Sequence, residues 1–302
     1  MGIPVFLLAE KQQTIGIASA SLEAAESMRG EPLYLDTLGI SETEKQGIQK
    51  NWTADGKIDA VVSHLIGATS GWGYAHLIGA LSDYPIPKVP LPDGDGKFLL
   101  DVGSSWGRWS MSAARKGWDV ISLDPSLGAL LAAKRVSSSL GLKLNLVCGD
   151  ARYLPFKANN FHGVFSYSVI QHFAEPDAEE ALAEIGRVLR KQGIAKIQMA
   201  HCGGLRSRYV LSRPDYHAAG PFRVRYWSLP AMRQSFADRI GPSTIKPEAF
   251  GGLGLLAEDF RIANSRAKLL ICASLMLKKF SAVVPPTIRL ADSVFVTSTK
   301  EH

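Results

Sequence analysis

Downstream of residue 97 the chain alternates between short apolar runs and longer segments with an apolar residue every three or four positions. The runs predict five strands, at 98–102, 120–123, 144–147, 163–166 and 194–199. The periodic segments predict helices between them, at 106–116, 126–140 and 177–189. Gly117 and Gly141 follow the first two helices, as glycine often does at a helix end. Alternation at this pitch is typical of βαβ units around a parallel sheet with helices on both faces.

The third predicted helix carries its own start and stop signals. Asp177 and Glu180 have the spacing of a capping box, which favours a helix start at that point. Gly193 stands just ahead of the next apolar run, so we expect it to end this helix.

The residues upstream of the alternating region predict a helical extension. Their apolar spacing favours helices at 19–28 and within 58–81. Prolines then exclude a helix at 84–90, and a turn at 93–96 leads into the alternating region. We therefore expect residues 1–96 to form an N-terminal helical extension or lid.

The residues downstream predict two final strands with an insertion between them. The strands are expected at 248–252 and 292–297, and an apolar helix at 267–279 lies between them. A connection of about forty residues is long for a compact domain, so we expect it to cap a pocket. The core domain is thus predicted to span 97–302, with a substrate-capping insertion at about 200–290.

Charge and cysteine usage limit the classes of partner. The formal net charge is +6 and the sequence pI is about 9.2, yet no basic run is longer than two residues. Nucleic acid is therefore not the expected partner. Cys148, Cys202 and Cys272 lie far apart without a CxxC pair, so we expect neither a metal site nor a disulfide framework.

The longest apolar run near the C-terminal end, 269–277, is too short to span a bilayer. The N-terminal residues lack the basic region and cleavable apolar stretch of a signal peptide. We therefore expect a soluble, cytoplasmic protein. The run at 269–277, followed by Lys278 and Lys279, is interpreted as a pocket cap or a homodimer face, ahead of contact with a membrane.

The strongest chemical signal follows the first strand. Asp101 ends it, Gly103 permits a tight turn, and Gly107 opens the next helix with room for a ligand to approach the backbone. A carboxylate at this point repels a pyrophosphate, so a dinucleotide is disfavoured and a cationic ligand is favoured.

Two further acids occupy equivalent places. Asp124 ends the second strand, where a carboxylate can bind both hydroxyls of a ribose. Asp150 ends the third, where it can accept a hydrogen bond from an amino group. Either acid alone is a common turn or helix-cap residue. Right-handed crossovers bring the carboxyl ends of parallel strands to one edge of a sheet, so acids at three successive strand ends, Asp101 included, point to a ligand.

At these residues the sequence resembles the class I S-adenosylmethionine-dependent methyltransferases, especially the small-molecule branch with the ubiquinone and menaquinone methyltransferases. The resemblance covers about a hundred residues, roughly a third of the chain. The matching motifs are Asp101-Val102-Gly103 with Gly107, Asp124, Gly149-Asp150-Ala151, Leu154-Pro155-Phe156, 160–166 and 188–193.

The resemblance implies a Rossmann-like α/β fold with a seven-stranded sheet, helices on both faces and an antiparallel last strand, here 292–297. It implies S-adenosylmethionine as the cofactor, lying across the strand ends. The core residues that it places on the cofactor are Asp101, Gly103, Ser104, Gly107, Asp124, Pro125, Asp150, Ala151 and Ser166.

The sequence departs from the family pattern at two places. Ser104-Ser105-Trp106 stands where the family often has smaller residues, and we expect Trp106 to narrow the loop. His162 stands where an aspartate is usual. Neither change removes a main cofactor contact.

The acceptor side offers two candidate bases. A sulfonium already carries an activated methyl group, so the protein must chiefly align the acceptor and exclude water. For a hydroxyl acceptor a base helps, and His172, after the fourth strand, is the first candidate. His201, after the fifth strand, is the second. The alternative for His172 is an exposed or structural histidine.

Two further segments have a functional and a structural interpretation. Trp72 and Tyr74, with His76, lie in a glycine-flanked stretch that we expect to close over the cofactor as a lid, or else to pack under the N-terminal helices. The segment 223–228 resembles a substrate-side segment, or else leads into a helix capped by Ser228.

The main interpretation is an S-adenosylmethionine-dependent methyltransferase acting on a small-molecule acceptor, with O-, N- and C-methylation all open. RNA or protein methylation is the alternative, suggested by the pI alone. The stretch 166–169 lacks the Asn/Asp-Pro-Pro-Tyr motif of amino-group methylases. A non-catalytic methyltransferase-like scaffold is disfavoured by the intact acids and glycines, and a dehydrogenase by Asp101 and a missing third glycine.

Overall fold

The computed structural model describes residues 2–11, 17–27, 33–53, 56–69, 74–218, 223–254 and 256–301. The chain divides into two compact units. The first comprises Met1–Gly96 and Gly103–Asp150, and the second comprises Lys97–Val102 and Ala151–His302. The division into an extension ending at residue 96 and a core domain stays a prediction.

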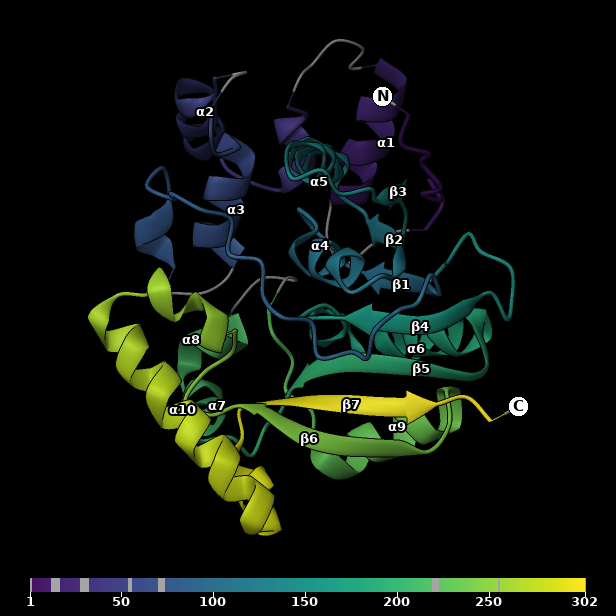
Figure 1. Cartoon of the computed structure of the whole chain (residues 1–302), viewed down its shortest axis with the longest axis vertical. Coiled ribbons are helices and arrows are strands. Elements are labelled where there is room, and N and C mark those ends of the chain that lie inside the picture. Colours follow the sequence, from purple (N-terminus) through teal and green to yellow (C-terminus); the bar gives the residue numbers. More distant parts are fainter. Residues whose placement is uncertain are drawn as a thin grey trace. The chain divides into compact units, whose positions relative to one another are not determined.

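Seven strands form a mixed sheet in the order β3-β2-β1-β4-β5-β7-β6 (Figure 1). Their bounds are β1 (Phe98–Val102), β2 (Asp119–Asp124), β3 (Asn145–Cys148), β4 (Phe161–Ser166), β5 (Leu189–Ala200), β6 (Ser243–Ala249) and β7 (Ser293–Thr299). In the first unit β2 and β3 are parallel, and in the second unit β4 is parallel to both β1 and β5. β7 runs antiparallel to β5 and to β6. The predicted α/β sheet with an antiparallel last strand is confirmed.

The helices of the first unit include two that begin at a capping serine side chain. They are α1 (Ile17–Ser27), η1 (Leu35–Leu38), α2 (Glu42–Asn51), α3 (Ala60–Thr69), η2 (Ala75–Leu77), α4 (Arg108–Arg115) and α5 (Leu127–Ser139). Ser41 and Glu44 form a capping box at α2, and Ser126 caps α5 by accepting the Ala129 N–H at 3.2 Å. α4 and α5 pack on β2, and α5 also packs on β3.

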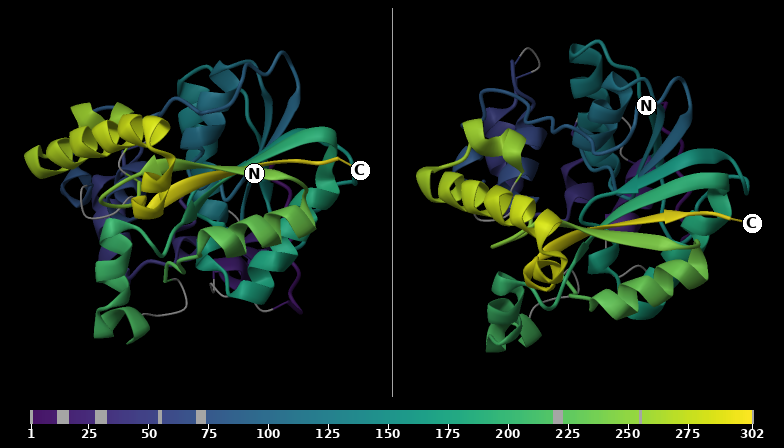
Figure 2. Two further views of the ribbon diagram at one scale, coloured as in Figure 1. Left: turned by 90° about the horizontal axis from the view of Figure 1, so that it is seen from below. Right: turned by 60° about the horizontal axis from the view of Figure 1, so that its bottom comes forward.

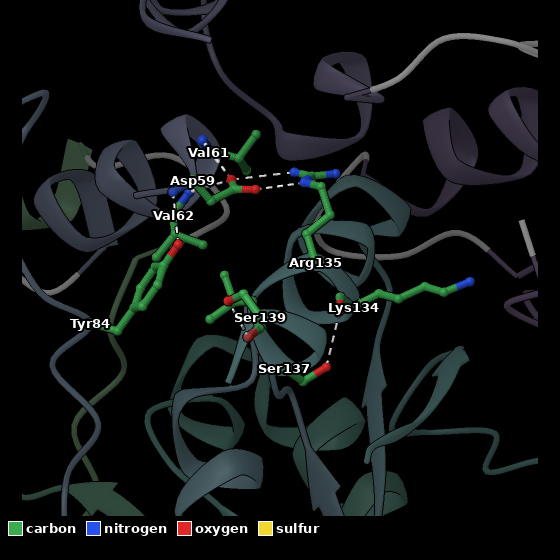
Figure 3. Close-up of polar contacts among 9 residues, drawn as sticks. Asp59, Val61, Val62, Tyr84, Lys134, Arg135, Ser137 and Ser139 are labelled. Atoms are coloured by element: carbon green, nitrogen blue, oxygen red, sulfur yellow. Dashed lines mark hydrogen bonds and ion pairs between the residues drawn. The ribbon is translucent and has the colours of Figure 1, made fainter. Parts of the chain in front are cut away.

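A buried ion pair fixes the N-terminal extension to α5 within the first unit (Figure 3). The Asp59 carboxylate accepts from the N–H groups of Val61 and Val62, at 3.0 and 3.2 Å, and so caps α3. Arg135 of α5 donates to the same carboxylate at 2.5 Å. The Tyr84 hydroxyl accepts the Asp59 N–H at 2.8 Å. The extension is therefore held by specific polar contacts as well as by packing.

The helices of the second unit surround the other five strands (Figure 2). They are η3 (Ile170–His172), α6 (Glu175–Val188), α7 (Leu205–Leu211), α8 (Pro214–Ala218), α9 (Leu229–Arg239), η4 (Ala257–Arg261), α10 (Ser265–Val283) and η5 (Pro285–Leu290). α6 packs on β5 and on α9, and its periodic apolar residues Leu182, Ile185 and Val188 are fully buried. Ser228 caps α9 by accepting the Ala231 N–H at 3.2 Å, which confirms the predicted helix start there.

The predicted start and end of the helix now seen as α6 are wrong. α6 begins at Glu175, two residues before Asp177, and the side chain of its N-cap residue, Ala174, makes no capping bond. Asp177 instead pairs with Arg152 at 2.7 Å, so its carboxylate is not available as a cap. The helix ends at Val188 and passes directly into β5, which contains Gly193. A Cβ on Gly193 would stand 2.7 Å from the Arg190 carbonyl, so this glycine serves a bulge in the strand.

The sixth strand begins earlier than predicted. β6 spans Ser243–Ala249, because consecutive residues pair with β7 from Ser243 onward. The predicted helix at 267–279 is confirmed as the longer α10. Among the described residues no helix is long and apolar enough to cross a membrane.

Candidate cofactor-binding and acceptor sites

The turn that follows β1 lies in the first unit and is tied to the end of β2. Gly103 and Gly107 have φ angles of +72° and +80°, in the left-handed region that glycine enters without steric cost. The N–H groups of Gly103 and Ser104 both donate to the Leu123 carbonyl, at 2.8 and 3.0 Å. These bonds fold the turn back over the last residues of β2.

Asp124, the last residue of β2, is a buried carboxylate held by backbone amides. Its Oδ2 accepts the N–H of Ser105 at 2.8 Å and its Oδ1 accepts the N–H of Ser126 at 2.9 Å. It forms no ion pair with any residue in the described ranges. Burial without a countercharge raises the pKa of Asp124 to about 6. Each carboxylate oxygen keeps acceptor capacity for a further donor.

Ser104 and Trp106, in the same turn, are also buried. The hydroxyl oxygen of Ser104 has no hydrogen-bond partner in the described part of the chain, and its residue is 5% exposed. An unpartnered buried hydroxyl costs about 1–3 kcal/mol, which a ligand or a water molecule can recover. Trp106 packs its ring against Tyr84, with centroids 6.0 Å apart, so the indole is part of the packing against the extension.

Asp150 and its neighbours follow β3. Asp150 is 4% exposed in the first unit, and Ala151, which opens the next segment of the second unit, is also buried. The Pro125 carbonyl, next to Asp124, accepts a hydrogen bond from the Cys148 thiol at 3.5 Å. Within the first unit the ends of β2 and β3 therefore lie side by side, as predicted.

In the second unit, Asp101 and Ser166 stand at the carboxyl ends of two neighbouring parallel strands. Val102 pairs with Ser166 and Asp101 with Phe165 in the register of β1 and β4. Asp101 is 2% exposed, and the fully buried Ser166 donates its hydroxyl to the Val102 carbonyl at 3.0 Å. Both residues are placed where the sequence predicts.

The segment 223–228 of the second unit contacts both candidate bases, His172 and His201. Arg225 donates its N–H to the Gln171 carbonyl at 2.7 Å and its guanidinium to the His172 carbonyl. Trp227 forms an isolated parallel bridge with His201. The two histidines thus lie at opposite ends of one short, extended stretch. From the sequence, this stretch is either a substrate-side segment or the lead into a helix capped by Ser228, and neither interpretation predicts its contacts with the two histidines.

His201 has a well-defined tautomer and charge state. Its Nδ1 lies 2.9 Å from the Ala291 carbonyl, which can only accept, so Nδ1 carries the proton and Nε2 is the acceptor. Burial lowers the pKa of His201, which keeps the ring neutral near pH 7. A Cβ on Gly203 would stand 2.7 Å from the ring Cε1, so glycine at that position leaves room for the imidazole. His172 is half-buried at the end of η3.

The expected lid is described only in part. Trp72 lies outside the described residues. Tyr74 precedes η2 and is 2% exposed, and its carbonyl accepts the Leu77 N–H at 2.9 Å. His76 is exposed on the same short helix. The burial of Tyr74 agrees with packing in the extension and leaves the lid hypothesis untested.

Glu248 is a buried acid that sequence analysis did not single out. It lies on β6 and is 6% exposed, and burial raises the pKa of its carboxyl group. Its Oε1 accepts the hydroxyl of Tyr167 at 3.2 Å, and Tyr167 directly follows Ser166 at the end of β4. No local pattern in the sequence indicates this pair, because the two residues are far apart in the chain and meet only across the sheet.

Known proteins resemble the central part of the chain. A family described as "Methyltransferase domain" matches residues 99–193. A biotin biosynthesis bifunctional protein BioHC from Cellvibrio japonicus is 36% identical over 173 residues, covering 57% of this chain and 30% of that protein. A demethylmenaquinone methyltransferase from Renibacterium salmoninarum is 34% identical over 131 residues, covering 43% of this chain and 47% of that protein.

A ubiquinone biosynthesis O-methyltransferase from Azorhizobium caulinodans is 28% identical over 98 residues, covering 32% of this chain and 35% of that protein. The chain therefore spans between 30% and 47% of the length of these curated relatives. Within the described ranges, no cluster of three or more His, Cys, Asp or Glu side chains could hold a metal ion.

Proposed function

Because residues 99–193 are a class I S-adenosylmethionine-dependent methyltransferase domain with S-adenosylmethionine as its cofactor, we propose that the chain methylates a small organic acceptor. When bound, the cofactor supplies a methyl group already activated by its sulfonium. The task of the protein is then to hold the two reactants in line and to exclude water.

The observation that carries the proposal is the state of Asp124. A buried carboxylate that faces no cation is costly, and a fold keeps such a group where a ligand completes its hydrogen bonds. Two backbone amides already orient the carboxylate, and its remaining lone pairs suit the two hydroxyls of a ribose. The unpartnered hydroxyl of Ser104, two residues into the adjoining turn, is a second group that a ligand would complete.

We assign the other cofactor contacts from the family resemblance. Asp101, Gly103 and Gly107 are assigned to the methionine end, where a carboxylate attracts a cationic ligand and the glycines permit close approach. The remaining assigned residues, at the ends of β2, β3 and β4, are Pro125, Asp150, Ala151 and Ser166.

Replacing Asp124 with alanine should weaken cofactor binding by about 1.5–3 kcal/mol, the scale of charge-assisted hydrogen bonds. Calorimetric titration with S-adenosylhomocysteine measures this directly. Asp119→Ala is the matched control, because Asp119 begins the same strand and accepts a hydrogen bond from Asn145 at 3.0 Å. Equal affinities for the two folded variants would remove Asp124 from the site.

Cofactor affinity should also depend on pH through Asp124. Because burial raises the pKa of Asp124 to about 6, its carboxyl group is largely protonated at about pH 5 and must lose that proton to bind as an ion. Affinity should therefore fall about tenfold between pH 7 and pH 5. The same titrations on Asp124→Ala should show a flat profile, and an unchanged fall in that variant would assign the effect to another group.

The extension should become protected when the cofactor binds. We retain the proposal that the stretch containing Trp72 and Tyr74 closes over the cofactor as a lid. Hydrogen exchange on the intact chain, with and without S-adenosylhomocysteine, should show slower exchange at residues 70–78. Equal exchange in both states would make these aromatics purely structural.

For a hydroxyl acceptor we assign the general base to His201, with His172 as the alternative. A neutral ring whose Nδ1–H is held by Ala291 presents Nε2 as the proton acceptor, which is the state that a base requires. Glu248 and Tyr167, which share a hydrogen bond in the same unit, are two further polar residues that we assign to the side of the methyl acceptor.

The proposal of a small acceptor rests on the relatives. Two relatives are named as a demethylmenaquinone methyltransferase and a ubiquinone biosynthesis O-methyltransferase. Small organic molecules are therefore the first class of acceptor to test, with O-, N- and C-methylation all open. RNA or protein methylation is the alternative, and the only feature that favours it is the net charge of +6. We also propose a cytoplasmic location, since Cys148, Cys202 and Cys272 are all free thiols.

The test is a methyl-transfer screen of the purified chain with labelled S-adenosylmethionine against separate pools of small organic molecules, RNA and protein. The proposal expects label in the small-molecule pool. Label in RNA or protein alone would instead identify the chain as an RNA or protein methyltransferase. Cofactor binding without transfer to any pool would favour a scaffold that binds but does not catalyse.

A further inference from the structure

The solvent side of α10 carries a continuous apolar stripe. Leu269, Met276, Phe280 and Val283 are 72%, 69%, 52% and 81% exposed, and their spacing of three, four or seven residues puts them on one face. The opposite face is buried against the second unit, where the Ser274 hydroxyl accepts the Phe250 N–H at 2.9 Å. Figures 1 and 2 show α10 as a long helix at the edge of its unit, beside β6. Large exposed apolar side chains in one row mark an interaction surface.

The net positive charge of the protein comes from the segment that contains this stripe. Residues 260–291 contain six basic side chains and no acidic one, so this segment alone has the formal charge of the whole chain, +6. On a helical wheel Lys268 and Lys279 flank the stripe on one side and Arg266 on the other. Lys268 lies over the ring of Phe260, 5.5 Å from its centroid, and Phe260 is itself 43% exposed.

We propose that α10 lies flat on an anionic lipid surface, with its apolar stripe in the acyl boundary and its basic side chains at the headgroups. An exposed apolar face flanked by Lys and Arg is the pattern of interfacial helices. The long stems of Lys268 and Lys279 can follow the apolar surface while their ammonium groups reach the phosphates. This inference goes beyond methyl transfer and does not depend on the acceptor.

Two other occupants fit the charge less well. A second copy of the chain would bring two segments of charge +6 together, and like charges at an interface oppose association. A nucleic acid would satisfy the basic residues but leave the apolar stripe in water. An anionic lipid surface satisfies both features at once. At 19 residues, α10 has a length of about 28 Å, and it is among the described helices that are not apolar enough to cross a membrane.

The test is co-sedimentation of the intact chain with vesicles of phosphatidylcholine, alone or with about one third phosphatidylglycerol. We expect binding to the anionic vesicles only, weakened by added salt. Phe280→Glu should reduce the bound fraction at least tenfold, because it places a charge in the stripe. Lys279→Gln should weaken partition about fivefold, the effect of one basic group at such a surface.

Phe6→Glu is the matched control, since Phe6 is 49% exposed in the first unit, close to the 52% of Phe280. It should bind vesicles like the unaltered chain, and all variants should retain their melting temperature and S-adenosylhomocysteine affinity. Equal loss for Phe6→Glu and Phe280→Glu, or no preference for anionic vesicles, would overturn the proposal. The proposal would also be overturned if the unaltered chain does not bind vesicles and forms a dimer in light scattering that Phe280→Glu dissociates.

Discussion

Replacing Gly103 with valine should abolish measurable S-adenosylhomocysteine binding while the protein remains folded. Gly103 has a φ angle of +72°, which a β-branched residue adopts only under strain. Relief of that strain pulls the turn away from the Leu123 carbonyl, and with it the N–H of Ser105 that orients the Asp124 carboxylate. Calorimetric titration of the folded variant measures the loss, and thermal melting checks the fold.

Gly141→Val is the matched control for this experiment. Gly141, after α5, has a φ angle of +65°, so valine there carries a similar strain of about 1–3 kcal/mol. An added Cβ meets no other atom within 4 Å at that position. It should lower the melting temperature and leave binding intact. Normal binding by Gly103→Val, or equal loss in both variants, would contradict a cofactor contact at the turn.

Replacing His201 with alanine should reduce turnover of a hydroxyl acceptor by about a hundredfold or more, with cofactor affinity unchanged. The reason is that Nε2 of a neutral, oriented imidazole takes the hydroxyl proton as the methyl group transfers. Steady-state kinetics and S-adenosylhomocysteine titration on the same preparation separate the two effects.

His172→Ala is the companion variant. If His201 is the base, His172→Ala retains turnover within a few fold, and a hundredfold loss confined to His172→Ala would reverse the assignment. The pH profile gives an independent readout. Burial lowers the pKa of His201, so the acid limb of turnover should lie below the ordinary histidine range and disappear in His201→Ala. An unchanged limb would restrict His201 to a structural role.

The sheet and the acids at its strand ends could be predicted because their signals are local. Continuous apolar runs identify buried strands, and an acid at the end of a run identifies the ligand edge without knowledge of tertiary contacts. Asp101 and Asp124 are found at the ends of β1 and β2 as that pattern requires.

Other features depend on contacts between distant residues, which periodicity does not encode. Asp177 has the spacing of a helix cap but is paired with Arg152, and Gly193 serves a strand bulge rather than a helix end. Glu248 meets Tyr167 only through the order of the strands in the sheet. The preference for His201 over His172 rests on one carbonyl contact with Ala291, far along the chain.

We propose that the turn at Gly103 and the carboxylate of Asp124 bind S-adenosylmethionine. Calorimetric titration of the intact, folded chain with this cofactor at neutral pH measures that binding. We expect saturable binding of one molecule per chain, lost in Gly103→Val and retained in Gly141→Val. A folded chain that takes up no cofactor, or one that binds it equally well in both variants, would contradict this proposal.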